Sequence, residues 1–201
     1  MDSNFTVVQR REAFIRHLYR LHYAVTSGNP HLSGEARQTL ARLRRSFAGQ
    51  QQEVEAYDVV FPHEPPLREQ DLWLLVAGLF ALHPHGNTVR GRSLGTAMQE
   101  LVEKRPSAAR RFTQLLSVEP AAMPHYLRQA VQLLRSADVS IDYLRLLNDL
   151  AAMRPSREET HRIRLNWARD YHKPKRRPRA GQTSTTEPEP TADATAEPID
   201  A

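Results

Sequence analysis

A run of eleven uncharged residues, Leu72–Leu82, constrains the fold more than any other part of this chain. Periodicity alone cannot distinguish a buried helix from a buried strand here, but with the four preceding residues the segment is too long for a typical strand. Two acidic residues at its start, Glu69 and Asp71, suit the positive end of a helix, and Pro84 ends it. A helix that is apolar on all sides must be surrounded, and this one falls short of the roughly 20 residues that cross a bilayer. We therefore predict that Arg68–His83 is the central helix of a soluble helical domain, with no membrane as a partner.

The composition excludes some chemistry and favours a basic surface. Cysteine is absent from the 201 residues, which excludes a disulfide framework, a thiolate metal site and a cysteine nucleophile. The N-terminal residues lack a basic segment followed by an apolar run, so we expect no secretory signal and a cytoplasmic location. The net charge is +5, and 25 of the 28 basic residues are arginine, which binds phosphate or carboxylate in a planar fork. A GC-rich genome would also favour arginine over lysine, and both explanations stay open.

Two helices with one apolar face each are expected before the central segment. In the segment 5–25 the apolar residues recur at helical spacing. We expect the second helix to begin at a capping Ser33 and to end at Phe47. Within it Arg37 and Arg44 are seven residues apart and therefore share a side, where few acidic residues offset them. That side is either the clearest basic surface of the first half or an ordinary solvated face.

The second half of the chain contains further helices and no convincing strand. We expect Ser93, Ser140 and Ser156 to cap three of these helices. The last of the three serines matches a capping box with Glu159, in which each residue bonds to the backbone of the other. Gly95, just inside the first of these helices, is expected to permit close helix packing.

The predicted fold class is all-α, with two small packed helical bundles and a disordered C-terminal tail. Short, proline-marked loops favour this architecture, and we place the bundles at residues 1–92 and 93–172. Residues 173–201 are first basic and then acidic and rich in proline and threonine, and their low hydrophobicity predicts disorder. The tail holds five basic and five acidic residues, so the net charge of +5 belongs to residues 1–172. This strengthens the case for a basic folded surface.

Six segments, taken in their order and spacing, carry a resemblance to a known family. The segments are 79–83, 93–95, 110–116, 126–134, 141–150 and 167–171. Together they resemble the CasB family, the small subunit of the type I-E CRISPR surveillance complex called Cascade. The resemblance covers roughly residues 10–172. Tyr143 and Met153 depart from the aromatic residues usual in the family, which indicates substitutions in the core.

The resemblance implies a small all-α protein without a catalytic site. Its members lie as a head-to-tail pair in the complex and contact the backbone subunits and the large subunit. Their basic surface supports the duplex of guide RNA and target DNA, and it holds the displaced single strand of DNA during R-loop formation in antiviral defence. The basic positions of the family correspond here to Arg44 and Arg45, Arg90 and Arg92, Arg110 and Arg111, and Arg128.

A surface that holds a strand of variable sequence should contact phosphates rather than base edges. Base pairing reads the sequence in RNA-guided recognition, and protein contacts to the backbone tip a near-balanced strand exchange. Most of the 14 aromatic residues (Trp 2, Tyr 6, Phe 6) fall on apolar faces, so we expect an electrostatic track with weak sequence preference. Helix-face neighbours add Arg37 and Arg135 to the family positions. The predicted nucleic-acid-binding residues are Arg37, Arg44, Arg45, Arg90, Arg92, Arg110, Arg111, Arg128 and Arg135.

No pattern in the sequence supports an enzyme, a metal site or a cofactor. His83 and His85 have no acidic residue or cysteine nearby and are interpreted as a loop pair. The glycines near residue 91 lack the lysine and the preceding strand of a phosphate-binding loop. The alternative to nucleic-acid binding is a structural helical adaptor whose arginines mediate only protein–protein assembly. Charge reversal at Arg44 and Arg45 would distinguish the two, because only the first function requires affinity for nucleic acid.

Overall fold

The computed structural model describes residues 5–85 and 90–174, and every regular element in that part of the chain is a helix. The α-helices are α1 (Val7–Val25), α2 (Pro30–Arg45), α3 (Gln50–Glu53), α4 (Tyr57–Val60), α5 (Gln70–Leu82), α6 (Leu94–Lys104), α7 (Ala109–Ser117), α8 (Met123–Ser136), α9 (Tyr143–Met153) and α10 (Arg157–Tyr171). Short 3-10 helices adjoin them: η1 (Ser46–Ala48), η2 (Val54–Ala56), η3 (Phe61–His63), η4 (Leu67–Glu69), η5 (Pro106–Ala108) and η6 (Pro120–Ala122). The prediction of an all-α fold is confirmed. The predicted disordered tail lies outside the described residues from position 175 onward.

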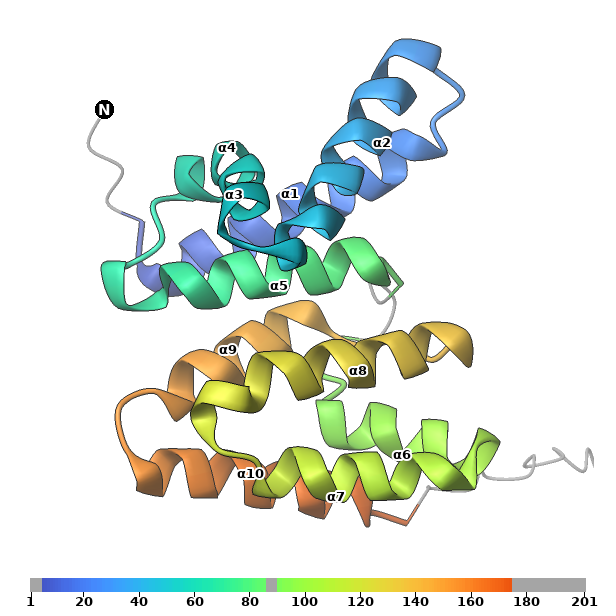
Figure 1. The fold of residues 1–201 in the computed structure, drawn as a ribbon, viewed down its shortest axis with the longest axis vertical. Coiled ribbons are helices and arrows are strands. Elements are labelled where there is room, and N and C mark those ends of the chain that lie inside the picture. Colours follow the sequence, from blue (N-terminus) through green and yellow to red (C-terminus); the bar gives the residue numbers. More distant parts are fainter. Residues whose placement is uncertain (1–4, 86–89, 175–201) are drawn as a thin grey trace, which may run out of the picture.

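Helix α5 lies at the centre of the molecule, as its uniform apolar sequence predicts. It contacts α2 and α4 on one side and α8 and α9 on the other (Figure 1). Every residue from Trp73 to Ala81 is buried, so no face of the helix meets solvent along this stretch. The predicted central helix is confirmed.

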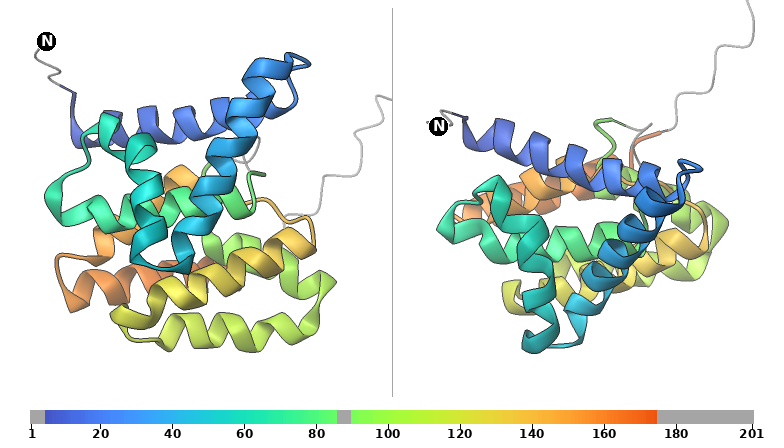
Figure 2. Two further views of the ribbon diagram at one scale, coloured as in Figure 1. Left: turned by 45° about the horizontal axis from the view of Figure 1, so that its top comes forward. Right: turned by 90° about the horizontal axis from the view of Figure 1, so that it is seen from above.

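Helix α2 contacts both α1 and α5, and it crosses α1 at an angle (Figure 2). Phe14 of α1 stacks on Trp73 with ring centroids 4.7 Å apart, and Tyr19 meets the ring of Phe80 edge-on at 4.9 Å. Leu18 of α1 is also fully buried, which confirms the apolar stripe predicted for this helix. Aromatic pairs of this kind stabilise a core beyond the area that they bury.

A polar cluster with little exposure to solvent also joins three helices near the start of α5. The carboxylate of Glu69 accepts hydrogen bonds from Arg11 of α1 at 2.7 Å and from the indole of Trp73 at 3.3 Å. Arg11 also donates to the side-chain oxygen of Asn148 on α9 at 3.1 Å. Because the buried charge is paired and hydrogen-bonded, its desolvation is largely offset.

In the second half, α6 packs closely against α10 at Gly95. A Cβ atom built on this glycine would lie 2.0 Å from the carbonyl oxygen of Trp167, so only glycine permits the approach. The indole of Trp167 donates to the carboxylate of Asp149 on α9 at 2.7 Å. The predicted role of Gly95 in helix packing is confirmed.

The buried apolar residues of both halves form one hydrophobic cluster. It includes side chains from α1 to α10, and α5 contributes to it along most of its length. Tyr143 and Met153 belong to the cluster, which agrees with their interpretation as core substitutions. The division into bundles at residues 92 and 93 stays a prediction.

Two of the predicted helix caps are wrong, and one is correct only in part. Asn29, not Ser33, caps α2, because its side chain accepts from the backbone N–H groups of residues 31 and 32, and Ser33 instead donates to the carbonyl of Val25. Asp142, not Ser140, caps α9 by accepting from the backbone N–H of residue 145. Ser156 does accept from the backbone of residue 159, but the carboxylate there bonds to the guanidinium of residue 162 instead of closing the capping box. Ser93 caps α6 as expected.

Candidate nucleic-acid interface

The first group of predicted arginines lies on the outer side of α2. Burial of the apolar stripe Ala36, Leu40 and Leu43 turns Arg37 and Arg44 toward solvent, and both are exposed. Arg44 donates from Nε to the carbonyl of the residue one turn before it at 3.3 Å. Arg45 is also exposed but pairs with Glu55 at 2.8 Å. Within residues 5–85 and 90–174, therefore, Arg37 and Arg44 have no acidic partner, whereas the charge of Arg45 is offset.

The short segment before α6 contains one arginine that is exposed to solvent and one that pairs with an acidic residue of the protein. Arg90 is exposed, whereas Arg92 is half-buried and forms an ion pair with Glu100 of α6. Burial alone would raise the pKa of Glu100, but hydrogen bonds and charges from Arg92 and Lys104 outweigh it and lower the pKa below its usual value. Arg92 therefore stabilises the fold through this ion pair, and its charge is less available to a phosphate.

Helix α7 brings two adjacent arginines to the mouth of a basic pocket. Phe112 is buried beneath them, which leaves Arg110 and Arg111 exposed. Both line a pocket of about 580 Å³ together with Arg105, a residue that the sequence did not indicate. Arg111 donates to the side chain of Gln129 on α8 at 3.1 Å. Three arginines thus line one depression, and the guanidinium of Arg105 donates there to the hydroxyl and carbonyl oxygens of Ser136. Counting every basic residue near position 110 would have included Arg105.

The arginines of α8 lie on its polar side, as their spacing predicts. The guanidinium carbon of Arg128 lies 4.9 Å from the ring centroid of Phe47, just beyond the end of α2. This cation–π contact links α8 to the segment that follows Arg44 and Arg45, and at a partly exposed site it contributes about 0.5–1 kcal/mol. Arg135, two turns further along α8, is exposed.

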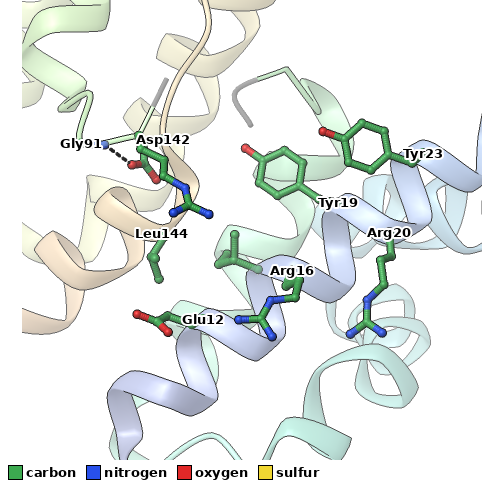
Figure 3. A pocket seen from close by; sticks show the side chains of 10 residues that line it. Glu12, Arg16, Tyr19, Arg20, Tyr23, Gly91, Asp142 and Leu144 are labelled. Carbon is green, nitrogen blue, oxygen red and sulfur yellow. Dashed lines mark hydrogen bonds between the residues drawn. The ribbon is translucent and has the colours of Figure 1, made fainter. Parts of the chain in front are cut away.

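The structure brings some predicted residues together and separates others. Arg110 and Arg111 share one pocket, and Arg128 lines a second one. Arg90 instead lines a third pocket beside α1, which Figure 3 shows from close by, together with Arg16 and Arg20. The three pockets have no lining residue in common. Spacing within α1 could not connect Arg16 and Arg20 with Arg90, since their shared pocket depends on tertiary packing.

The pocket on α7 has the chemistry of an anion-binding site, because three arginines and no acidic residue line it. The pocket of Arg128 is also lined by Glu53 and Asp71, and that of Arg90 by Glu12 and Asp142, so carboxylates offset part of their positive charge. Guanidinium groups match the planar geometry of a phosphate and do not lose their charge at neutral pH. Across the described residues, no group of three or more His, Cys, Asp or Glu side chains could hold a metal ion. His83 is buried, with Nε2 2.8 Å from the carbonyl oxygen of Val139, and its ring lies 5.1 Å from that of His85. Nor does any described helix have the length and apolarity to span a membrane.

Comparison with known proteins identifies the family. Residues 39–172 match the family model described as CRISPR-associated protein Cse2. The chain belongs to the Cse2 family. A sequence comparison with curated proteins found no match.

Solved structures of CasB proteins share the fold of this Cse2 protein. It is 30% identical to CasB from Thermus thermophilus, covering 80% of this chain and 96% of that one with a TM-score of 0.62. CasB from Thermobifida fusca is 24% identical over 85% of this chain and 100% of its own, with a TM-score of 0.65. A chain of a CRISPR RNA-guided surveillance complex is 22% identical over 83% of this chain and 93% of its own, with a TM-score of 0.60. The resemblance to the CasB family that the sequence segments indicated is confirmed.

Proposed function

We propose that this protein is the non-catalytic small subunit of an RNA-guided CRISPR Cascade complex. It assembles there with the backbone and large subunits, and a second copy lies head to tail beside it. Membership of the Cse2 family and the fold shared with a chain of a surveillance complex support this assignment. In this role the protein contributes contacts rather than bond-making chemistry.

The observation that carries the nucleic-acid part of the proposal is the exposure of arginines without acidic partners. Arg37, Arg90 and Arg110 are exposed, and none of them forms an ion pair within the described part of the chain. Cations in this state exchange their counterions for phosphates at little cost, whereas a paired arginine must first break its ion pair. The surface therefore suits phosphate contacts that do not depend on base sequence.

Such contacts fit the exchange of strands in an R-loop. The RNA–DNA duplex that forms is about as stable as the DNA duplex that opens, so modest backbone contacts decide the balance. Arginines that hold the displaced strand oppose its return to the target strand. Arginines along the duplex stabilise the product side of the same exchange.

The test is the affinity of the full chain for labelled single-stranded DNA, measured by fluorescence anisotropy across a salt series. Each phosphate that the protein neutralises should contribute a slope of about −0.7 in log K against log salt. The variant Arg110→Glu with Arg111→Glu should bind more weakly and with a shallower slope, without a change in thermal stability. The matched control is Arg162→Glu with Arg169→Glu, which changes the net charge equally on exposed positions of α10.

Equal losses in the two double variants would show that only net charge matters and would refute the interface. Charge reversal at Arg44 and Arg45 tests the adaptor alternative. If this change abolishes assembly with the other subunits and leaves the affinity for DNA intact, the arginines mediate protein contacts only.

A further inference from the structure

A pocket of about 460 Å³ beside α1 combines cations with aromatic rings (Figure 3). Its walls come from α1, from the segment at Arg90 and Gly91, and from the start of α9. Arg16, Arg20 and Arg90 line it together with two tyrosines. Neither of the other two arginine-lined pockets described above is lined by a tyrosine.

The two tyrosines lie one turn apart on α1 and extend in the same direction (Figure 3). Their ring centroids are 6.4 Å apart, with 28° between the planes. Tyr19 is only 8% exposed and is held by an edge-on contact with Phe80, whereas Tyr23 is 47% exposed. The inner ring is therefore fixed by the core and supports an outer ring that is accessible from solvent.

The inner hydroxyl stays a hydrogen-bond donor at neutral pH. Burial raises the pKa of Tyr19, and the nearby Asp142 and Tyr23 raise it further. The carboxylate of Asp142 is already used, because one oxygen accepts from the backbone N–H of Gly91 at 2.6 Å and the other from that of Arg145 at 3.0 Å. This aspartate builds the wall of the pocket, and its hydrogen bonds hold the segment beside Arg90 against the start of α9.

Glu12 also lines the pocket, one turn before Arg16 on α1 (Figure 3), but the arginines of the pocket are not held in ion pairs. Arg16 and Arg20 are exposed, as is Arg90, and none of the three takes part in an ion pair among the residues that the structure describes. Arg16 and Arg20 are four residues apart on α1, so they lie on the same side of the helix, about 6 Å apart along its axis. The pocket therefore offers anion-binding groups next to an accessible aromatic ring.

We propose that this pocket holds one unstacked nucleotide of a single-stranded nucleic acid, with its base on Tyr23 and its phosphates on Arg16, Arg20 and Arg90. This proposal rests on the proposed function and deepens it. Arginines alone would make a track that is indifferent to the bases, as the sequence led us to expect. A stacked base adds affinity that depends on the presence of a base but tolerates its identity, since every base has a flat aromatic face.

The proposal predicts that removing the ring of Tyr23 weakens binding only where a base is present. The probes are two labelled single-stranded DNA oligonucleotides of equal length, one of normal thymidines and one with a central run of abasic sites. In the full chain, Tyr23→Ala should lower affinity for the normal strand at least about fivefold, the low end of the known range for base stacking. Its effect on the abasic strand should stay below about twofold, because the phosphates are unchanged.

Two control variants separate stacking from other effects. Tyr23→Phe keeps the ring and should retain the affinity. Phe5→Ala removes another exposed ring, 61% accessible at the start of the described chain, and should leave binding unchanged. In addition, Arg16→Gln with Arg20→Gln should reduce the salt slope by about 1.4 on both strands, since each lost phosphate contact accounts for about 0.7.

The outcomes distinguish this site from the broader function. If Tyr23→Ala binds both strands with the wild-type affinity, or loses the same factor in affinity on both, the pocket does not stack a base and the proposal is refuted. The proposed function would still stand if Arg110→Glu with Arg111→Glu weakens binding. If the wild-type chain binds neither strand at about 50 mM salt, where electrostatic binding is strong, both proposals are refuted.

Discussion

Replacing Gly95 with alanine is expected to destabilise the protein, because the added methyl group has no room. A Cβ atom there would lie 2.0 Å from the carbonyl oxygen and 2.8 Å from the carbonyl carbon of Trp167. Carbon and carbonyl oxygen normally approach no closer than about 3.3 Å, so α6 and α10 would have to separate by more than about 1 Å. The blocking atoms belong to the backbone, so no change of side-chain rotamer relieves the contact.

Two opposing effects determine how much the free energy of unfolding falls in Gly95→Ala. Overpacking a core typically costs about 1–3 kcal/mol, and a gap of about 0.5–1 Å removes a quarter to a half of the dispersion energy between facing atoms. Alanine is about 1 kcal/mol more favourable than glycine within a helix. With overpacking at the upper end of its range, the net loss in the free energy of unfolding is about 2 kcal/mol. For a protein of 201 residues this lowers the Tm by roughly 4–8 °C.

Gly34→Ala is the matched control, because the same substitution there meets no obstacle. Gly34 lies inside α2, is exposed, and a Cβ atom on it would have no neighbour within 4 Å. Only helix propensity changes, so the free energy of unfolding should rise by about 0.5–1 kcal/mol. Urea unfolding followed by far-UV circular dichroism measures both variants. The reasoning is refuted if Gly95→Ala is as stable as the wild type, or if the two variants change stability in the same direction.

Two further predictions concern the core and its titration. Trp73→Ala should lower the free energy of unfolding by roughly 3–5 kcal/mol, because the ring is fully buried against Phe14. A Tm that barely changes would contradict the central position of α5. Lowering the pH from 7.5 to 5.5 should reduce the free energy of unfolding, which urea titrations at the two pH values measure. Burial is the main cause that lowers the pKa values of His17, His63 and His83, so below about pH 6.5 the unfolded chain binds more protons than the folded one. An unchanged free energy at pH 5.5 would show that these side chains titrate equally in both states.

The helical core could be predicted because its signals are local and repeated. The apolar run of α5 and the stripe of α1 depend on spacing within one element, and burial follows directly from that spacing. The helix caps were harder to predict, since several side chains that could cap a helix lie close together in the sequence. Asn29 and Ser33 both qualify as caps for α2. Pro30 at the first helical position favours the asparagine, whereas Ser33 lies where its hydroxyl reaches the end of α1.

The candidate site could be predicted by residue type but not by partner. Arg92 pairs with Glu100 across eight residues, and Arg45 pairs with Glu55 across ten. Neither spacing is the three or four residues that bring side chains of one helix into contact, so the pairs depend on how the chain turns between two elements. The same holds for Arg105, which lines one pocket with Arg110 and its neighbour because η5 turns the chain between α6 and α7.

Partners decide how much each arginine contributes to binding a phosphate. An arginine that already pairs with a carboxylate releases no counterion when it turns to a phosphate, and it leaves the carboxylate exposed beside the incoming anion. Arg45 and Arg92 are therefore weaker contributors than their type suggests, whereas Arg37, Arg90 and Arg110 act at full charge. The basic surface that results is a set of separate pockets, chiefly on α7 and beside α1. On α8 the pocket of Arg128 is shared with Glu53 and Asp71. A flexible strand can follow such a discontinuous surface, because each of its phosphates can adjust independently, whereas a rigid duplex engages only the pockets that match its own spacing.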